Sequence, residues 1–302
     1  AVFLHDDVEG RHDVGDGRLV VRTEHRGAVG DDDVVAHVAF DFRMFGRLEP
    51  DVLFLVEADY ALKYVDTDYT LDVVNDLGVS KDALANQYKY TQDIVTDSKG
   101  ALKGASWQAC PAGMIYRRDI AKKVFKTDDP EKIQELFKDW DSFKAASKKL
   151  KDAGYLTTAS VNDTYRVFSN NVTSKWVDEN NVINVDDNIK KWVDMSKAMV
   201  DAKQTDTHAL WSDDWAKGFY ETGNVFCYFG PAWLIDFSMH CDEKGSVGYD
   251  GGWAVTEGPQ GFFWGGTWIC AAAGTDNQEL VKDLMLCLTT CLLYTSDAAD
   301  EL

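Results

Sequence analysis

The spacing of apolar and polar residues between positions 50 and 290 predicts short strands that alternate with amphipathic helices. Short apolar runs predict strands at 51–56, 102–107, 114–116, 225–229 and 268–273. Apolar residues three and four apart predict helices at 119–125, 130–137, 141–154, 185–203, 211–221, 231–239 and 278–288. This alternation favours an α/β architecture with a largely parallel sheet.

The helix predicted over residues 141–154 carries the clearest boundary signals. Asp141 can cap its amino end, and Gly154 follows its last turn. Phe143, Ala146 and Leu150 share one face of this helix. The segment is therefore predicted to start and stop at defined residues.

Residues 1–49 differ in composition from the rest of the chain. They contain no Lys, Ser, Asn, Gln, Tyr, Trp, Ile or Cys, yet hold six of the nine Arg and four of the six His. Val codons can be reverse complements of Asp and His codons, and this stretch is rich in Val and Asp. We expect an out-of-frame or antisense translation here. The alternative is a disordered acidic arm.

Residues 291–302 also differ from the central part of the chain. Eleven consecutive residues, 291–301 (CLLYTSDAADE), resemble the translated transposon-end adapter of sequencing libraries. A natural polar tail is the alternative. The expectation is that residues 50–290 carry the protein and that it is truncated at both ends.

The charge of the chain excludes some classes of partner. The chain has 31 basic and 51 acidic residues, a net charge of −20, and residues 50–290 keep 25 bases against 37 acids, or −12. Nucleic acids and anionic membranes need a basic footprint, so we expect neither as a partner. No run approaches the roughly 18 apolar residues of a spanning helix, and no signal peptide is visible.

Motifs for cofactor and metal chemistry are absent from the sequence. No P-loop, HExxH or GxSxG motif occurs, and the six Cys form no CxxC pair. His208 and His240 are not spaced as a metal pair. We therefore expect no cofactor and no metal.

Two carboxylates follow the first predicted strand. Glu57 and Asp59 lie where ligand groups gather in open α/β sheets, and a pair of carboxylates can serve as a glycosidase acid and base. Next to a helix start, they can instead cap the helix. The sequence favours the capping or hydrogen-bonding role and leaves the enzyme open.

Tryptophans gather at the ends of the predicted elements. They are Trp107, Trp211, Trp215, Trp233, Trp253, Trp264 and Trp268. Flat indole faces can stack on the C–H face of a sugar ring, and Asp59, Gln108 and Arg166 could hydrogen-bond its hydroxyls. Core packing remains an equal alternative for any single Trp, whereas the whole set favours a ligand cleft.

Several stretches, in order, resemble the extracellular solute-binding proteins (family 1) of carbohydrate ABC transporters. They are 50–59 (PDVLFLVEAD), 102–119 (LKGASWQACPAGMIYRRD), 139–143 (DWDSF), 219–223 (FYETG), 230–233 (GPAW) and the glycine pair 265–266. The resemblance covers about residues 50–290. It implies a periplasmic-binding-protein-like type II fold, with two α/β lobes, a hinge and an interlobe cleft, truncated at both ends. The first lobe would comprise 50–109 and 254–290, and the second lobe 110–253.

The resemblance also implies a function and a set of ligand contacts. Hinge closure would capture a sugar or oligosaccharide outside the cytoplasm, and the closed monomer would deliver it to an ABC permease. The protein would be a lipoprotein or periplasmic, and not an enzyme. The implied ligand-binding residues are Glu57, Asp59, Tyr60, Trp107, Gln108, Tyr165, Arg166, Trp233, Trp264, Gly265, Gly266 and Trp268. The alternatives are a carbohydrate-active enzyme using Glu57 and Asp59, or an inert fragment.

Overall fold

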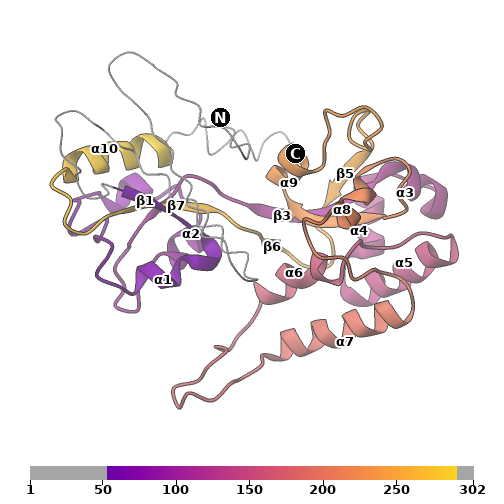
Figure 1. The fold of residues 1–302 in the computed structure, drawn as a ribbon, viewed down its shortest axis with the longest axis horizontal. Coiled ribbons are helices and arrows are strands. Elements are labelled where there is room, and N and C mark those ends of the chain that lie inside the picture. Colours follow the sequence, from indigo (N-terminus) through magenta and orange to yellow (C-terminus); the bar gives the residue numbers. More distant parts are fainter. Residues whose placement is uncertain (1–52, 291–302) are drawn as a thin grey trace. The chain divides into compact units, whose positions relative to one another are not determined.

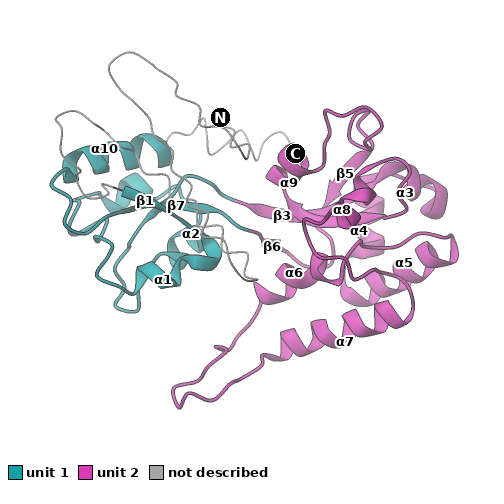
Figure 2. Cartoon of the chain, in the orientation of Figure 1, with its two compact units in different colours: residues 1–109, 265–301 teal, residues 110–264, 302 magenta. Residues whose placement is uncertain are grey.

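The computed structural model describes residues 53–290, so the predictions for residues 1–49 and 291–302 lie outside the described residues. The chain divides into two compact units (Figure 2). The described part of the first unit comprises residues 53–109 and 265–290, and the second unit comprises residues 110–264. Within the described range the chain passes between the units at 109–110 and at 264–265.

The first unit is built on a small antiparallel sheet with strand order β1-β7-β2 (Figure 1). Its strands are β1 (Leu53–Glu57), β2 (Ala105–Ser106) and β7 (Thr267–Ala271). Its helices are α1 (Leu62–Val65), α2 (Lys89–Ile94), α10 (Gln278–Thr289) and the 3-10 helices η1 (Ala58–Tyr60) and η2 (Lys81–Leu84).

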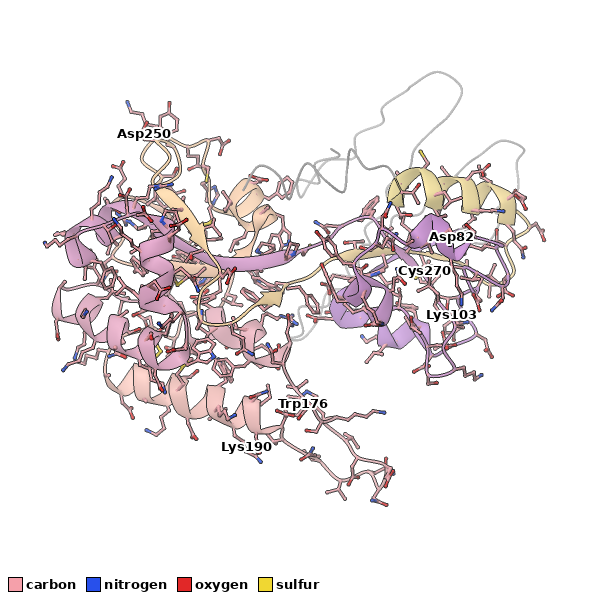
Figure 3. All side chains as sticks on the ribbon, turned by 180° about the vertical axis from the view of Figure 1, so that it is seen from behind. Asp82, Lys103, Trp176, Lys190, Asp250 and Cys270 are labelled. Carbon is pink, nitrogen blue, oxygen red and sulfur yellow. The ribbon has the colours of Figure 1, made fainter. Side chains whose placement is uncertain are left out.

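The central strand β7 is buried on both faces. Successive side chains of a strand point to opposite faces, so Ile269 and Ala271 pack on one side and Trp268 on the other. The face of Ile269 is covered by Val281 and Met285 of α10. Cys270 of the same strand is also buried (Figure 3). Burial on both faces explains why the sequence of β7 is an almost unbroken apolar run.

The second unit holds a four-stranded sheet with the order β4-β3-β5, in which β6 also pairs with β3. Its strands are β3 (Pro111–Arg117), β4 (Cys227–Pro231), β5 (Trp253–Thr256) and β6 (Phe262–Phe263). Its helices are α3 (Arg118–Phe125), α4 (Pro130–Phe137), α5 (Trp140–Asp152), α6 (Tyr165–Ser169), α7 (Asp187–Asp201), α8 (Asp213–Ala216), α9 (Ala232–Ser238), η3 (Val161–Thr164) and η4 (Lys217–Phe219).

The sheet of the second unit separates two hydrophobic clusters. Met114 and Tyr116 of β3 face the cluster that α3, α4, α5, α6 and α7 contribute to. Ile115 faces the opposite cluster, which contains Trp215 and Tyr228. Because helices and loops cover both faces, the strand reads as an unbroken apolar run in the sequence.

The expectation of a largely parallel sheet is wrong. Every ladder between the named strands of the described range is antiparallel. Parallel pairing occurs there in isolated bridges, such as Leu156 with Val225 and Thr158 with Thr205. Alternating strands and helices predict parallel strands only where consecutive strands are neighbours in the sheet. Here β1 instead pairs with β7, which comes from the far end of the chain.

The structure also moves two predicted boundaries. The helix α5 is capped by Asp139, not Asp141, since the Asp139 carboxylate accepts the Ser142 N–H at 2.7 Å. This hydrogen bond lowers the pKa of Asp139. Residues 254–264, which the family resemblance placed in the first lobe, lie in the second unit because β5 and β6 both pair with β3.

Candidate functional site

Three tryptophans from distant parts of the sequence meet in the second unit. The Trp211 and Trp264 rings are stacked, with centroids 5.2 Å apart and an interplanar angle of 26°. Trp233 lies 5.3 Å from Trp264 and 6.0 Å from Trp211. We call Trp211, Trp233 and Trp264 the aromatic platform. Trp211 keeps 51% of its surface exposed, while the other two are half-buried.

Local backbone features place each ring of the platform. Trp233 is the second residue of α9, directly after the end of β4. Trp264 follows β6, and its N–H donates to the carbonyl of Cys110 at 3.1 Å. Trp211 has a φ of 68°, a left-handed conformation that is rare for a bulky residue. Such backbone is typical of positions held by surrounding structure, and often of functional sites.

An arginine lies over one ring of the platform. The Arg166 guanidinium carbon is 5.9 Å from the Trp264 ring centroid, within the range of a cation–π contact. Arg166 is the second residue of α6, and its neighbour Tyr165 packs edge-on against Trp192 at 4.9 Å. The structure therefore brings Arg166 to the platform and gives Tyr165 a packing contact with α7.

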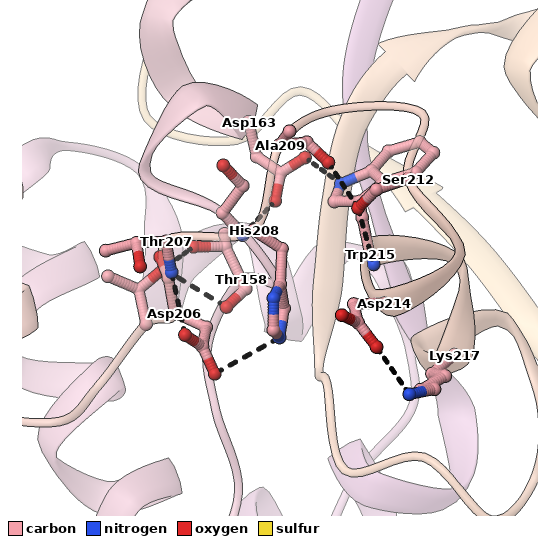
Figure 4. Close-up of polar contacts among 12 residues, drawn as sticks. Thr158, Asp163, Asp206, Thr207, His208, Ala209, Ser212, Asp214, Trp215 and Lys217 are labelled. Carbon is pink, nitrogen blue, oxygen red and sulfur yellow. Dashed lines mark hydrogen bonds and ion pairs between the residues drawn. The ribbon is translucent and has the colours of Figure 1, made fainter.

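A buried carboxylate, that of Asp163, contacts Trp215, which packs against the platform (Figure 4). The Trp215 indole N–H donates to Asp163 Oδ1 at 2.8 Å, and the Ser160 backbone N–H donates to Asp163 Oδ2 at 2.8 Å. Burial raises the pKa of Asp163 to about 7, because loss of hydration outweighs these two hydrogen bonds. Trp215 in turn packs edge-on against Trp211, with centroids 5.0 Å apart.

The predicted carboxylates of the first unit have local roles. The Glu57 side chain accepts the Asp59 backbone N–H at 2.8 Å and so caps η1. This is the capping role that the sequence favoured. Asp59 itself is exposed, and Lys63 Nζ lies 4.7 Å from the Tyr60 ring centroid.

The other predicted residues of the first unit gather where the chain enters β7. The Thr267 hydroxyl donates to the Gln108 side-chain oxygen at 3.5 Å, and the Trp107 N–H donates to the Thr267 carbonyl at 3.4 Å. Gly265 and Gly266 have φ values of 72° and 115°, which favour glycine. The glycine pair thus turns the chain between the two units.

The expected ligand contact of Trp268 is wrong. Trp268 lies in β7, within the strand predicted over residues 268–273, and its surface is fully buried. Its indole N–H donates to the Thr91 carbonyl at 2.7 Å, so its polar edge is satisfied within the core. The residue is a core tryptophan of the first unit.

Trp211 is the platform residue that the predicted site omitted. The sequence placed it at the start of a helix, among tryptophans at element ends, but did not select it. In the structure it precedes Ser212, which caps α8, and its left-handed backbone turns the ring toward Trp264. The available signal was its position just before a capping serine.

Two kinds of feature are missing from the part of the chain that the structure describes. Between residues 53 and 290, no group of three or more His, Cys, Asp or Glu residues is arranged to hold a metal ion. Over the same range, every helix is too short or too polar to span a bilayer.

Two α/β units with two chain crossings match the type II periplasmic-binding-protein-like fold. A family model described as bacterial extracellular solute-binding protein matches residues 47–291, and the chain belongs to this family. The resemblance seen in the sequence is therefore confirmed. Membership implies an extracytoplasmic location.

Solved structures share this fold. An extracellular solute-binding protein of family 1 has a TM-score of 0.70 at 21% identity, and the match covers 80% of this chain and 62% of that one. The lacto-N-biose-binding protein of an ABC transporter from Bifidobacterium longum, solved with lacto-N-biose, has a TM-score of 0.63 at 16% identity and coverages of 81% and 61%.

The sugar-binding protein MalE from Xanthomonas citri has a TM-score of 0.62 at 13% identity, with coverages of 82% and 64%. The chain thus spans less than two thirds of the length of these proteins. No curated protein matches the chain.

Proposed function

We propose that the protein captures a sugar or oligosaccharide outside the cytoplasm and delivers it to an ABC importer. The observation that carries the proposal is the aromatic platform, with its exposed Trp211 ring and the adjacent Arg166. An indole face matches the apolar C–H face of a pyranose, and a guanidinium donates hydrogen bonds to hydroxyl groups. Structures with this fold have been solved with β-1,6-galactobiose and with lacto-N-biose bound.

Capture by hinge closure suits a chain that crosses twice between two units. Each crossing adjoins residues of the predicted site: Trp107 and Gln108 precede the first, and Gly265 and Gly266 follow the second. Hinges are a few residues at element ends that absorb large changes in φ and ψ. A ligand that binds the closed form more tightly shifts the population toward closure. We propose that Glu57, Asp59, Tyr60, Trp107 and Gln108 serve the ligand from the first unit.

The alternative of a carbohydrate-active enzyme receives less support. A glycosidase needs one carboxylate free to donate a proton and a second as base or nucleophile. Glu57 instead uses its carboxylate to cap η1 through the Asp59 N–H. We therefore propose a binding protein without catalysis. Its partners would be the permease subunits of the importer, and it would act as a monomer, either periplasmic or lipid-anchored.

Tryptophan fluorescence with product analysis tests this function. The 302-residue chain is titrated with β-1,6-galactobiose, lacto-N-biose, a chitin oligosaccharide and D-mannitol. The proposal expects a saturable change in emission with at least one glycan, and every glycan recovered intact. Released monosaccharide would support the enzyme instead. The absence of any saturable change across the panel would reject carbohydrate capture.

A further inference from the structure

A buried carboxylate that is linked to the aromatic platform through Trp215 calls for an explanation. Asp163 has 6% of its surface exposed, although aspartate is rarely buried unless its charge is compensated. Its oxygens accept two N–H groups, from Ser160 on the same turn and from the Trp215 indole. The Ser160 bond belongs to the capping box of η3, whereas the Trp215 bond reaches across the fold to α8.

The Trp215 ring links this carboxylate to the platform. Trp215 is buried, and its ring packs edge-on against Trp211, Phe219 and Tyr228. Its carbonyl accepts the Tyr228 hydroxyl at 3.0 Å, and its backbone N–H donates to the Ser212 hydroxyl at 3.3 Å. Figure 4 shows Asp163, Trp215 and Ser212 joined by these contacts. The Trp215 indole therefore contacts both the Asp163 carboxylate and the platform ring of Trp211.

The same turn also leads to the platform arginine. The helix η3, which contains Asp163, runs directly into α6, and Arg166 lies three residues after Asp163. A single carboxylate thus contacts Trp215 of α8, which packs against Trp211, and lies in the turn that leads into α6 and Arg166. A purely structural helix cap would need only the bond to Ser160.

We propose that Asp163 is a positioning residue for the aromatic platform: its carboxylate holds the Trp215 indole, and Trp215 holds Trp211 against Trp264. This inference rests on the proposed function for the identity of the ligand. The contacts among Asp163, Trp215 and the platform do not depend on that function. A charge-assisted hydrogen bond is about twice as strong as a neutral one. The ionised carboxylate therefore holds Trp215 more firmly than the protonated acid, and platform order becomes pH-dependent.

Other titratable groups lie around this carboxylate. The strand β4 contributes the Cys227 thiol and the Tyr228 hydroxyl, and burial raises the pKa of both. Figure 4 also shows two ion pairs near this carboxylate. His208 Nε2 lies 3.3 Å from a carboxylate oxygen of Asp206, and Lys217 pairs with Asp214 of α8. His208 therefore needs a control variant of its own.

Circular dichroism in the tryptophan region gives a test without ligand. Stacked indoles couple, so the Trp211 and Trp264 signal should weaken on acidification with a midpoint near pH 7. Asp163→Asn, which can accept only one of the two N–H groups, and Trp215→Phe, which lacks the indole donor, should both abolish this midpoint. His208→Gln should keep it. A midpoint retained in both variants, or lost in His208→Gln alone, would overturn the proposal.

Affinity measurements separate this inference from the proposed function. With lacto-N-biose or β-1,6-galactobiose, the wild-type chain should bind about threefold to tenfold more tightly at pH 8 than at pH 5.5, from the strength of a charge-assisted hydrogen bond. Asp163→Asn should bind weakly at both pH values. Tight binding that does not change with pH, and is unchanged by Asp163→Asn, would reject the positioning role while leaving sugar capture intact. Absence of binding in every variant would reject sugar capture, and the dichroism midpoint would then decide the positioning role by itself.

Discussion

Replacing Asp163 by asparagine should change how the stability of the second unit depends on pH. Burial raises the pKa of this carboxyl from its usual value of 3.8 to about 7 in the folded protein. Hydrogen bonds from Trp215 and from the backbone at Ser160 and Ala159 lower the pKa of Asp163, but burial outweighs them. The folded protein therefore binds a proton more tightly here than the unfolded chain does.

The sign and the size of the effect follow from proton linkage. Between pH 4 and pH 7 the folded state carries this proton and the unfolded state has released it, so stability falls as pH rises. A shift of about three units corresponds to roughly 4 kcal/mol, since each unit is worth about 1.4 kcal/mol. Asp163→Asn carries no ionisable group at this position, so it loses this slope.

Urea unfolding of the wild-type chain and Asp163→Asn at pH 4.5, 6, 7 and 8.5 measures the effect. The difference in unfolding free energy between the two proteins should shift by several kcal/mol in favour of the variant as the pH rises, and should level off above pH 7. Asp206→Asn removes an acid from the same unit that pairs with His208 at the surface, and it serves as the control. Parallel curves for wild type and Asp163→Asn would refute the reasoning.

Three further substitutions test the packing, the loops and the turn between the units. Phe137→Ala removes a buried ring that stacks on Phe226, and should cost about 3–5 kcal/mol with an unchanged urea slope. Asp186→Ala removes the acceptor for the backbone N–H groups of residues 173 and 174, so their amide exchange should accelerate. Gly266→Ala places a Cβ 3.0 Å from Trp268 at a φ of 115° and should destabilise measurably, whereas Gly261→Ala, with open space around it, should not.

Much of the secondary structure could be predicted from the sequence because the strands are buried on both faces. The apolar run that becomes β4 and the amphipathic pattern of α10 both match elements in the structure. The short strands β5 and β6 escaped prediction, since two to four residues carry too little periodicity. The direction of the strands could not be predicted either, because the pairing of β1 with β7 depends on contacts between distant parts of the chain.

The candidate site could be predicted only in part. Arg166, Trp233 and Trp264, three of the residues that the resemblance implied as ligand contacts, lie together in the second unit. Trp268 belongs to the core of the first unit. The preceding glycine pair, Gly265 and Gly266, instead suggested a residue at the ligand site. Trp211 was not selected, because its ring reaches the platform through a left-handed backbone that no pattern of apolar residues reveals. The one signal in the sequence was its position just before a capping serine.

The glycan affinities of Trp211→Ala and Trp176→Ala test the central claim most directly. Each tryptophan is 51% exposed on the second unit, but Trp211 lies on the platform and Trp176 lies on the segment between α6 and α7 (Figure 3). Sugar capture on the platform predicts that Trp211→Ala weakens binding of every bound glycan by about fivefold or more, the scale of one aromatic contact. Trp176→Ala should bind as the wild type does. Equal affinities in the two variants, or a loss confined to Trp176→Ala, would contradict the account.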